Sequence, residues 1–229
     1  MKTIGIIGGL GPPSTVKYYE GLVDGVQRAL GGVHAPRILI TSVNGEDVRQ
    51  LRLGGNTAAE GAFYAREAER LEKAGADFIL IASNTSHKNA PYIEAAVKIP
   101  LLHLADATAA AVTRRGFKTV ALLGTAPTME DSFYKDRLTA AGLVVMVPDA
   151  DARRYVSDTI YNELVRNVVT DAASLRFREI IDRLHNDGAE AIILGCTELT
   201  LLDLTGVAAP LFDTVKIHVD AALKHAMSE

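Results

Sequence analysis

The expected fold rests on Gly75-Ala76-Asp77-Phe78-Ile79-Leu80-Ile81-Ala82-Ser83-Asn84-Thr85, which returns further along the chain as Gly188-Ala189-Glu190-Ala191-Ile192-Ile193-Leu194-Gly195-Cys196-Thr197-Glu198. Each copy opens with glycine, alanine and an acid, continues with an apolar run, and ends in small and polar residues. The apolar run is too short for a helix and suits a strand buried on both faces. Polar residues after such a strand lie at its carboxyl end, where open α/β sheets bind their ligands. We therefore expect Ser83 and Cys196 to occupy equivalent positions.

Two further pairs of segments indicate an internal duplication. Thr3–Gly8 is similar to Thr119–Gly124, and Pro100–His103 is similar to Pro210–Asp213. All the pairs occur in the same order, at offsets of roughly 110 to 116 residues, which is the size of one domain. A single match between apolar strands would mean little, but several in register favour two copies of one unit.

Apolar strand patterns alternate with helical patterns along the whole chain, which is typical of βαβ units and a parallel sheet. The sequence therefore predicts an α/β protein of two pseudo-symmetric Rossmann-like lobes, each with a mostly parallel sheet flanked by helices. We expect residues 1–104 with 209–229 to form the first lobe and residues 105–208 the second. Residues 43–56 look like a loop, either a lid or a solvated connection. If the lobes face each other, Ser83 and Cys196 lie across one cleft.

Composition excludes several classes of function. The net charge of −4 over 229 residues provides no basic surface for nucleic acid, and no apolar run is long enough to span a membrane. The chain begins directly with a strand pattern, without the layout of a signal peptide. A single cysteine fits a reducing compartment, so we expect a cytoplasmic protein. No cluster has the spacing of metal ligands, so no metal site is expected.

Two acid/base groups on opposite sides of one carbon atom can invert it, since one removes the α-proton and the other returns a proton to the opposite face. Cys196 suits the first role if backbone amides at a helix start lower the pKa of its thiol. The alternative is an inert buried thiol. Ser83 is a weaker base than a thiolate, and its alternatives are a helix cap or a hydroxyl that contacts the ligand. His87 lies close behind Ser83 and could face the cleft.

The polar groups around these two residues suggest a site for a small carboxylate. Backbone amides of the glycine-rich segment that contains Gly9 can approach such a ligand. Further donors that can bind a carboxylate and stabilise a carbanion are the side chains of Asn84, Thr85, Thr125 and Thr197.

Three motifs together resemble the aspartate/glutamate racemase family: Gly8-Gly9-Leu10-Gly11-Pro12, Ser83-Asn84-Thr85-Ser86-His87 and Gly195-Cys196-Thr197-Glu198-Leu199. The resemblance implies an isomerase of two α/β lobes with its active site between them. It also implies an amino-acid racemase that needs no pyridoxal phosphate or other cofactor and no metal, and that forms a homodimer. The family's second catalytic cysteine falls on Cys196. The first falls on Ser83, a departure that implies action biased toward the L enantiomer.

The resemblance also assigns residues to the substrate. It places the α-carboxylate among Asn84, Thr85, Thr125 and Thr197. Gly9, His87 and Glu198 are further substrate contacts that we expect from their positions at the strand ends. The basic residues that could bind a side-chain carboxylate are Arg49, Arg52 and Arg166.

Two other functions remain open on the sequence. The same lone thiol could serve a decarboxylase, an isomerase of another kind or a lyase of the same superfamily. A chain with one base missing could also bind an amino acid or a dicarboxylate without turnover. In each case the partner is a small molecule rather than a nucleic acid or a membrane.

Overall fold

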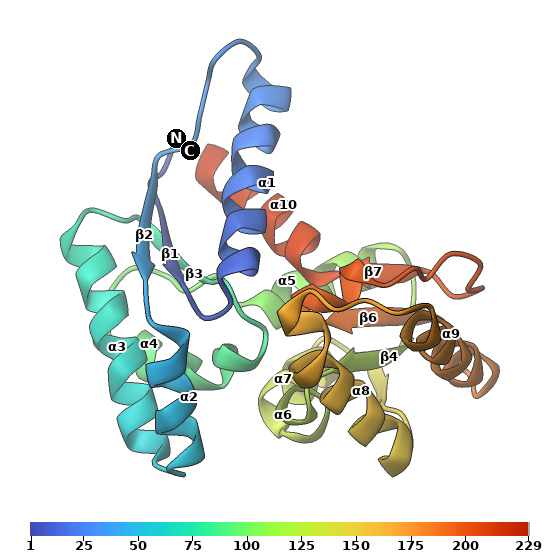
Figure 1. Cartoon of the computed structure of the whole chain (residues 1–229). Helices are drawn as coiled ribbons and strands as arrows, with labels where there is room; N and C mark the ends of the chain where they lie inside the picture. The colour runs from blue at the N-terminus through green and yellow to red at the C-terminus, as the bar shows by residue number, and fades with distance from the viewer. Residues whose placement is uncertain (229) are drawn as a thin grey trace. The chain divides into compact units, whose positions relative to one another are not determined.

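The computed structural model describes residues 1–228, which divide into two compact units. The first unit contains Met1–Leu104 and the chain from His218 onward, and the second contains Ala105–Ile217. Each unit holds one parallel sheet with helices around it (Figure 1), so the predicted α/β class with two parallel sheets is confirmed. Within residues 1–228, no helix is both long and apolar enough to cross a membrane.

The sheet of the first unit has three parallel strands. β1 (Ile4–Gly8) lies between β2 (Ile38–Ser42) and β3 (Phe78–Ile81). Every residue of β1 and β3 is buried, as their continuous apolar runs predict. The helices assigned to this part of the chain are α1 (Pro12–Leu30), α2 (Gly45–Leu53), α3 (Thr57–Lys73), the short 3-10 helix η1 (Thr85–Asn89), α4 (Ala90–Ala96) and α10 (Thr214–Met227).

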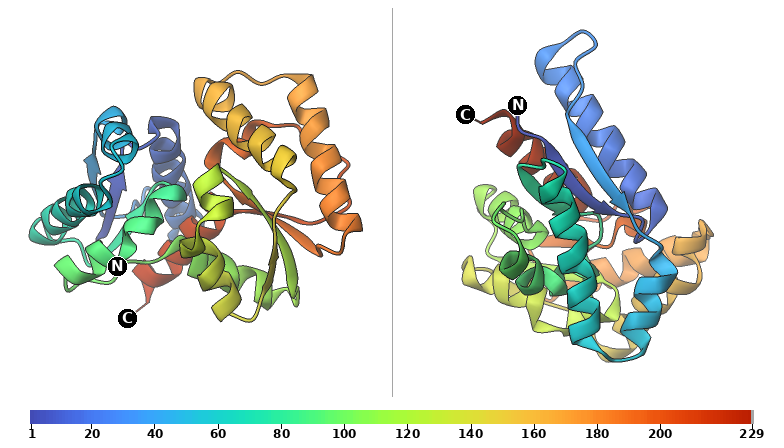
Figure 2. Two further views of the ribbon diagram at one scale, coloured as in Figure 1. Left: turned by 90° about the horizontal axis from the view of Figure 1, so that it is seen from below. Right: turned by 90° about the vertical axis from the view of Figure 1, so that its left-hand side faces the viewer.

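Helices cover both faces of this sheet. On one face, Tyr64 and Leu71 of α3 pack in an apolar cluster with Ile79 of β3. α1 lies on the opposite side of the strands from α3 (Figure 2). α1 and α10 approach closely at Gly25, where an added Cβ would lie 2.1 Å from Leu223 Cδ1. Any larger residue at Gly25 would push these two helices apart.

The sheet of the second unit has four parallel strands in the order β5-β4-β6-β7. These are β4 (Thr119–Gly124), β5 (Val144–Met146), β6 (Ala191–Gly195) and β7 (Leu211–Asp213). The helices are α5 (Leu104–Arg114), α6 (Ala126–Glu130), α7 (Ser132–Ala140), α8 (Ala150–Asn162), the 3-10 helix η2 (Leu164–Arg166), α9 (Asp171–Asn186) and the 3-10 helix η3 (Thr197–Leu201). Val156 of α8 and Phe177 of α9 pack in one apolar cluster with Leu123 and Ile192 of the sheet.

The two units repeat one topology. β1 and β4 are central, β2 and β5 lie on one side of them, and β3 and β6 lie on the other. Leu101 then forms a parallel bridge with Ile79, as Leu211 pairs with Ile192 in the second unit.

The acid that opens each copied stretch makes the same contacts in both units. Asp77 accepts the Thr3 backbone N–H at 2.6 Å and donates its own N–H to the Thr3 carbonyl at 2.9 Å. Glu190 accepts the Thr119 N–H at 2.7 Å and donates to the Thr119 carbonyl at 2.9 Å. Each acid therefore ties the start of its strand to the start of the central strand.

The boundary between the units differs from the expected one at residues 209–217. The sequence pattern places them in the first lobe, but the structure places them in the second unit. The reason is pairing, because β7 adds to β6 in register, with Phe212 opposite Ile193. The chain joins the first unit again at His218, within α10.

The expected loop at residues 43–56 is largely a helix. α2 begins after Asn44, whose side chain accepts the backbone N–H of Glu46 at 3.1 Å. Such a cap satisfies one of the free N–H groups of the first turn. The segment carries one buried apolar residue, Val48, and is otherwise polar, which explains why its pattern resembles a loop.

Candidate active site

Cys196 lies directly after β6, where the 3-10 helix η3 begins. Its side chain keeps 9% of its surface exposed and packs in the apolar cluster of the second unit. The sulfur nevertheless has a polar partner, since Cys196 Sγ donates to Glu198 Oε2 at 2.9 Å. The Thr197 hydroxyl donates to the same oxygen at 2.6 Å. The thiol is therefore paired with a carboxylate that can accept its proton.

The pKa of the Cys196 thiol is raised well above its ordinary value. Burial is the largest cause, and the negative charge and hydrogen bond of Glu198 act in the same direction. The backbone N–H groups of Thr197 and Glu198 lower the pKa, as expected for amides at a helix start, but burial and the carboxylate outweigh them. We expected backbone amides at the start of the helix to lower the pKa of Cys196. In this structure the pKa is raised instead, so that expectation is wrong and the thiol is protonated.

Replacing Glu198 by glutamine should move the alkylation of Cys196 to lower pH. The change removes the negative charge that disfavours the thiolate and keeps the shape of the side chain, so the pKa of the thiol should fall. Only the thiolate reacts readily with iodoacetamide. Because the chain has one cysteine, the mass increase of the intact protein between about pH 6 and 10 reports this thiol alone.

Glu190→Gln is the matched control, because Glu190 stands just before the same strand and accepts backbone N–H groups of Lys118 and Thr119. Its alkylation profile should coincide with that of the unmodified protein. If the Glu198→Gln profile also coincides with it, or moves to higher pH, the charge of Glu198 does not govern the thiol.

Ser83 occupies the equivalent position after β3. Its side chain is half-buried, and its Oγ accepts the hydroxyl hydrogen of Ser86 at 3.0 Å. Ser86 in turn accepts the hydroxyl hydrogen of Tyr64 at 2.7 Å. The residue at the N-terminal cap of η1 is Asn84, without a capping bond from its side chain. Ser83 is therefore the last hydroxyl of a hydrogen-bonded chain rather than a helix cap.

His87 lies inside the first unit, and both of its ring nitrogens are engaged there. Nδ1 donates to the Ser83 carbonyl at 2.7 Å, and Nε2 accepts the Leu104 backbone N–H at 3.3 Å. Burial, followed by the neighbouring His103 and His218, holds the pKa of His87 well below its usual value, so the ring is neutral. His87 therefore holds the end of β3 in place, which differs from the substrate contact that we expected.

His218 completes this group of buried rings. Burial lowers the pKa of His218 to about 4, so it too is neutral at physiological pH. Its Nε2 donates to the Leu102 carbonyl at 2.8 Å, and its Nδ1 accepts the Tyr18 hydroxyl hydrogen at 2.7 Å. Within residues 1–228, no group of three or more histidine, cysteine or acidic residues is arranged to hold a metal ion.

The expected carboxylate contacts all follow the ends of strands. Asn84 and Thr85 follow β3, Thr125 follows β4, and Thr197 follows β6, and each is 4–7% exposed. Gly124 and Gly195 are partners in the parallel register. Thr125 therefore lies alongside Cys196 at the same edge of the sheet, as the duplication predicts. The Thr125 hydroxyl also contacts the hydroxyl of Thr128 at 3.1 Å.

Gly9 follows β1 as Thr125 follows β4. Its backbone φ is +79°, and an added Cβ would lie 2.1 Å from the Val43 carbonyl oxygen, so only glycine fits there. Its amide donates to the Thr15 hydroxyl at 2.9 Å. The expected bond from this amide to a ligand would have to replace that contact.

The three expected arginines lie in different settings. Arg49 forms a two-pronged ion pair with Glu46 on the surface of α2, at 2.7 Å for both nitrogens. Arg52 pairs with buried Glu60 at 3.0 Å. Arg166 is exposed at the end of η2. The first unit therefore offers Arg52, which acts on Tyr64, and the second offers Arg166.

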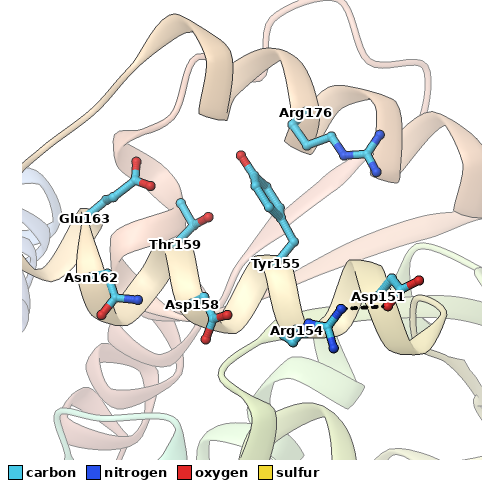
Figure 3. Close-up of a pocket in the computed structure, with 8 residues that line it drawn as sticks. All are labelled: Asp151, Arg154, Tyr155, Asp158, Thr159, Asn162, Glu163 and Arg176. Atoms are coloured by element: carbon cyan, nitrogen blue, oxygen red, sulfur yellow. Dashed lines mark hydrogen bonds and ion pairs between the residues drawn. The ribbon is translucent and has the colours of Figure 1, made fainter.

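A separate cavity of about 460 Å³ lies in the second unit between α8 and α9 (Figure 3). Its charged lining includes Asp151 and Arg154, which pair with each other at 2.9 Å, and Arg176, which pairs with Glu179 at 2.8 Å. Tyr155 stands between the two helices. None of the expected site residues lines this cavity.

A model of the Asp/Glu/hydantoin racemase family matches residues 7–222. The chain belongs to this family. The matched residues include both copied strand ends, with Ser83 and Cys196.

Relatives with known structures share the whole fold of this racemase-family chain. A candidate Asp/Glu racemase from Yersinia pestis is 39% identical, with a TM-score of 0.95 and coverage of 100% of both chains. An aspartate racemase homologue from Pyrococcus horikoshii is 32% identical, with a TM-score of 0.87 and the same coverage. The broad specificity amino-acid racemase RacX of Bacillus subtilis is 25% identical over 228 residues, or 92% of each chain.

Sequence reasoning missed the residues behind Ser83. Tyr64 and Ser86 were not selected, although Ser86 stands three residues after Ser83, the spacing at which side chains meet on a helical turn. Glu60 and Lys88 were also missed. Lys88 pairs with buried Glu60 at 2.7 Å, next to Arg52. Only the i, i+3 spacing of the two serines could have revealed part of this network.

Proposed function

We propose that this protein is a cofactor-independent amino-acid racemase that acts preferentially on one enantiomer, the L form, with Cys196 as its acid/base. The observation that carries this proposal is the 2.9 Å hydrogen bond from Cys196 Sγ to Glu198 Oε2 at the end of β6. A thiol paired with a carboxylate has a place to send its proton before it acts as a base. The family membership supplies the reaction class.

The reaction begins with the protonated thiol. Glu198 accepts the Cys196 proton, and the resulting thiolate removes the α-hydrogen of the amino acid. The positive charge of the substrate ammonium group favours the thiolate, since a nearby opposite charge stabilises the ionised form. We assign to Thr125, which follows the strand next to that of Cys196, and to Thr197 the hydrogen bonds to the α-carboxylate, on which negative charge develops; Thr197 would have to turn its hydroxyl away from Glu198 Oε2 to donate there.

Ser83 takes the place of the second acid/base group. A proton returned from Ser83 to the face not used by Cys196 produces the other enantiomer. The hydroxyl is a poor base, so exchange of the α-hydrogen of the D-amino acid is expected to be slower than exchange of that of the L-amino acid. This asymmetry is the reason for the proposed preference for the L enantiomer.

We also propose the setting in which this reaction takes place. A single cysteine is compatible with a reducing compartment, which favours the cytoplasm. The homodimer implied by the resemblance remains a proposal, and sedimentation of the purified protein measures its mass directly. The substrate is a small amino acid or dicarboxylate, for which Arg52 and Arg166 are the candidate side-chain contacts.

Incubation in deuterated water tests the function. Each common amino acid, as the separate L and D forms, should be analysed by chiral chromatography and mass spectrometry. We expect deuterium at the α-carbon of at least one L-amino acid, with formation of its D enantiomer. Thermal stabilisation by an amino acid without any exchange would instead favour a binding protein, and release of carbon dioxide would favour a decarboxylase.

A further inference from the structure

The Ser83 hydroxyl, which stands where the resemblance places the family's first cysteine, is connected to a buried tyrosine. Tyr64 Oη donates to Ser86 Oγ at 2.7 Å, and Ser86 Oγ donates to Ser83 Oγ at 3.0 Å. Tyr64 is fully buried and Ser86 is 1% exposed, whereas Ser83 is half-buried. The chain of hydroxyls therefore runs from the interior of the first unit to the end of β3. Since Ser83 is the acceptor in this chain, its own hydrogen is available to a ligand.

We propose that Tyr64 and Ser86 form a proton relay that supplies the proton delivered by Ser83 to the α-carbon. This inference rests on the proposed racemase function. Ser83 is the group that would contact the substrate, and Tyr64 and Ser86 act through it as positioning and relay residues.

In the proposed relay, protons move along the chain of hydroxyls in three coupled transfers. The carbanion takes the hydroxyl hydrogen of Ser83, which forms the new C–H bond. Ser83 takes the hydrogen of Ser86, and Ser86 takes the hydrogen of Tyr64, which becomes a phenolate. The phenolate recovers a proton through the same chain once the product has left and Ser83 meets water.

The relay explains how the weakly acidic hydroxyl of Ser83 can donate a proton. An aliphatic hydroxyl alone would become an alkoxide after donating its proton, whereas a phenol ionises with an ordinary pKa of about 10. Burial raises the pKa of Tyr64, but a phenol remains a stronger acid than an aliphatic hydroxyl, so the negative charge comes to rest on Tyr64. A cysteine at the same position would need no such help, because its thiol is acidic itself.

The surroundings of Tyr64 offset part of the cost of a buried phenolate. Burial raises the pKa of Tyr64 above its ordinary value and the charge of Glu60 acts in the same direction, while the hydrogen bond with Ser86 and the nearby Arg52 lower it in part. Arg52 and Lys88 share a single carboxylate, that of buried Glu60, at 3.0 Å and 2.7 Å. The group of three therefore carries one excess positive charge beside Tyr64, which would pair with the phenolate.

The pKa of Glu60 agrees with this excess of positive charge. Burial raises the pKa of this carboxyl group, but the hydrogen bond from Lys88 and the charge of Arg52 outweigh burial, so the pKa is lowered. Glu60 is therefore ionised, and its carboxylate accepts from Arg52, Lys88 and Asn89. It cancels one of the two positive charges and leaves the other.

The test compares two rates in the Tyr64→Phe variant, namely inversion of the α-carbon and exchange of the α-hydrogen with deuterated water. Exchange with retention needs only Cys196, whereas inversion also needs a proton from Ser83. Because an acid/base group contributes about 100- to 10,000-fold and Ser83 itself remains, the ratio of inversion to exchange should fall about tenfold or more. Ser86→Ala breaks the relay at another link with a small change in volume, and it should lower the ratio in the same way.

The same Tyr64 substitution in a Ser83→Cys protein separates loss of the relay from a structural effect of the substitution. In the Ser83→Cys protein the thiol carries its own acidic proton, so adding Tyr64→Phe should leave the ratio within about twofold. Tyr134→Phe is the matched control, since Tyr134 is also fully buried and its hydroxyl donates to Thr108 at 3.4 Å in the second unit. Its ratio should equal that of the unmodified protein.

The outcomes separate this inference from the function on which it rests. If no amino acid exchanges its α-hydrogen with the unmodified protein, the racemase function fails. If exchange occurs without any inversion, Ser83 returns no proton and the relay is wrong. If Tyr64→Phe and Ser86→Ala lower exchange and inversion equally, or if Tyr64→Phe lowers the ratio equally in the Ser83→Cys background, the relay is also wrong.

Discussion

Replacing Cys196 by alanine should abolish the exchange of the α-hydrogen of an L-amino acid, with a fall in rate of about a thousandfold or more. No other cysteine is present to take over the role of the thiolate. The sulfur also donates to the carboxylate of Glu198 at 2.9 Å, so this proton acceptor keeps the Thr197 hydroxyl but loses the thiol. The measurement is the rate of deuterium incorporation at the α-carbon, followed by mass spectrometry.

A second substitution, Cys196→Ser, tests the same role of the thiol. It keeps the volume and the hydrogen bond to Glu198 but replaces the thiol with a hydroxyl that does not readily ionise. Its exchange rate should fall nearly as far as that of Cys196→Ala. Unfolding temperatures of both variants close to that of the unmodified protein exclude a folding defect. Exchange that persists in either variant at the original rate means that Cys196 does not carry the reaction.

Replacing Ser83 by cysteine should raise the rate at which the D-amino acid exchanges its α-hydrogen, by about a hundredfold. A thiolate at this position can remove the α-hydrogen of the D form, which the Ser83 hydroxyl does poorly. Ser83 follows β3 and Cys196 follows β6, so the two equivalent strand ends would then each carry a thiol. The measurement is the initial rate of deuterium incorporation into each enantiomer, with the enantiomers separated by chiral chromatography.

The matched control for this change is Ser132→Cys, since Ser132 is exposed at the start of α7 and also adds a second thiol. It should leave the exchange of both enantiomers as it is. If Ser83→Cys alters the exchange of neither enantiomer, Ser83 and Cys196 do not act on one substrate, and the proposed two-sided reaction fails. A rise in α-hydrogen exchange of the L-amino acid alone would equally contradict the role given to Ser83.

The duplicated strands were predictable because their information is local. Each strand is marked in the sequence by a continuous apolar run between a Gly-Ala-acid opening and a polar end. Both β3 and β6 form at these runs. The acids Asp77 and Glu190 repeat for a reason that the pattern alone did not reveal. Each binds the start of the central strand in its own unit.

Elements with weak local patterns were not predictable. α2 is a polar helix with one buried apolar residue, and its start depends on the Asn44 cap. β7 itself was expected as a short strand, but its pairing with β6, which moves residues 209–217 into the second unit, was not. His87 looks like a site residue in the sequence, yet its neutral ring is occupied by Ser83 and Leu104.

The sequence by itself determined the α/β class, the repeat, and the placement of Ser83 and Cys196 at matching strand ends, because strand periodicity and small polar residues after a strand are properties of neighbours in the chain. Only the tertiary structure decided what those two side chains meet. Glu198 turns its carboxylate to the thiol, and Tyr64, from a helix that precedes β3, reaches Ser83 through Ser86. Such contacts depend on how separate elements pack, which no periodicity in the chain records.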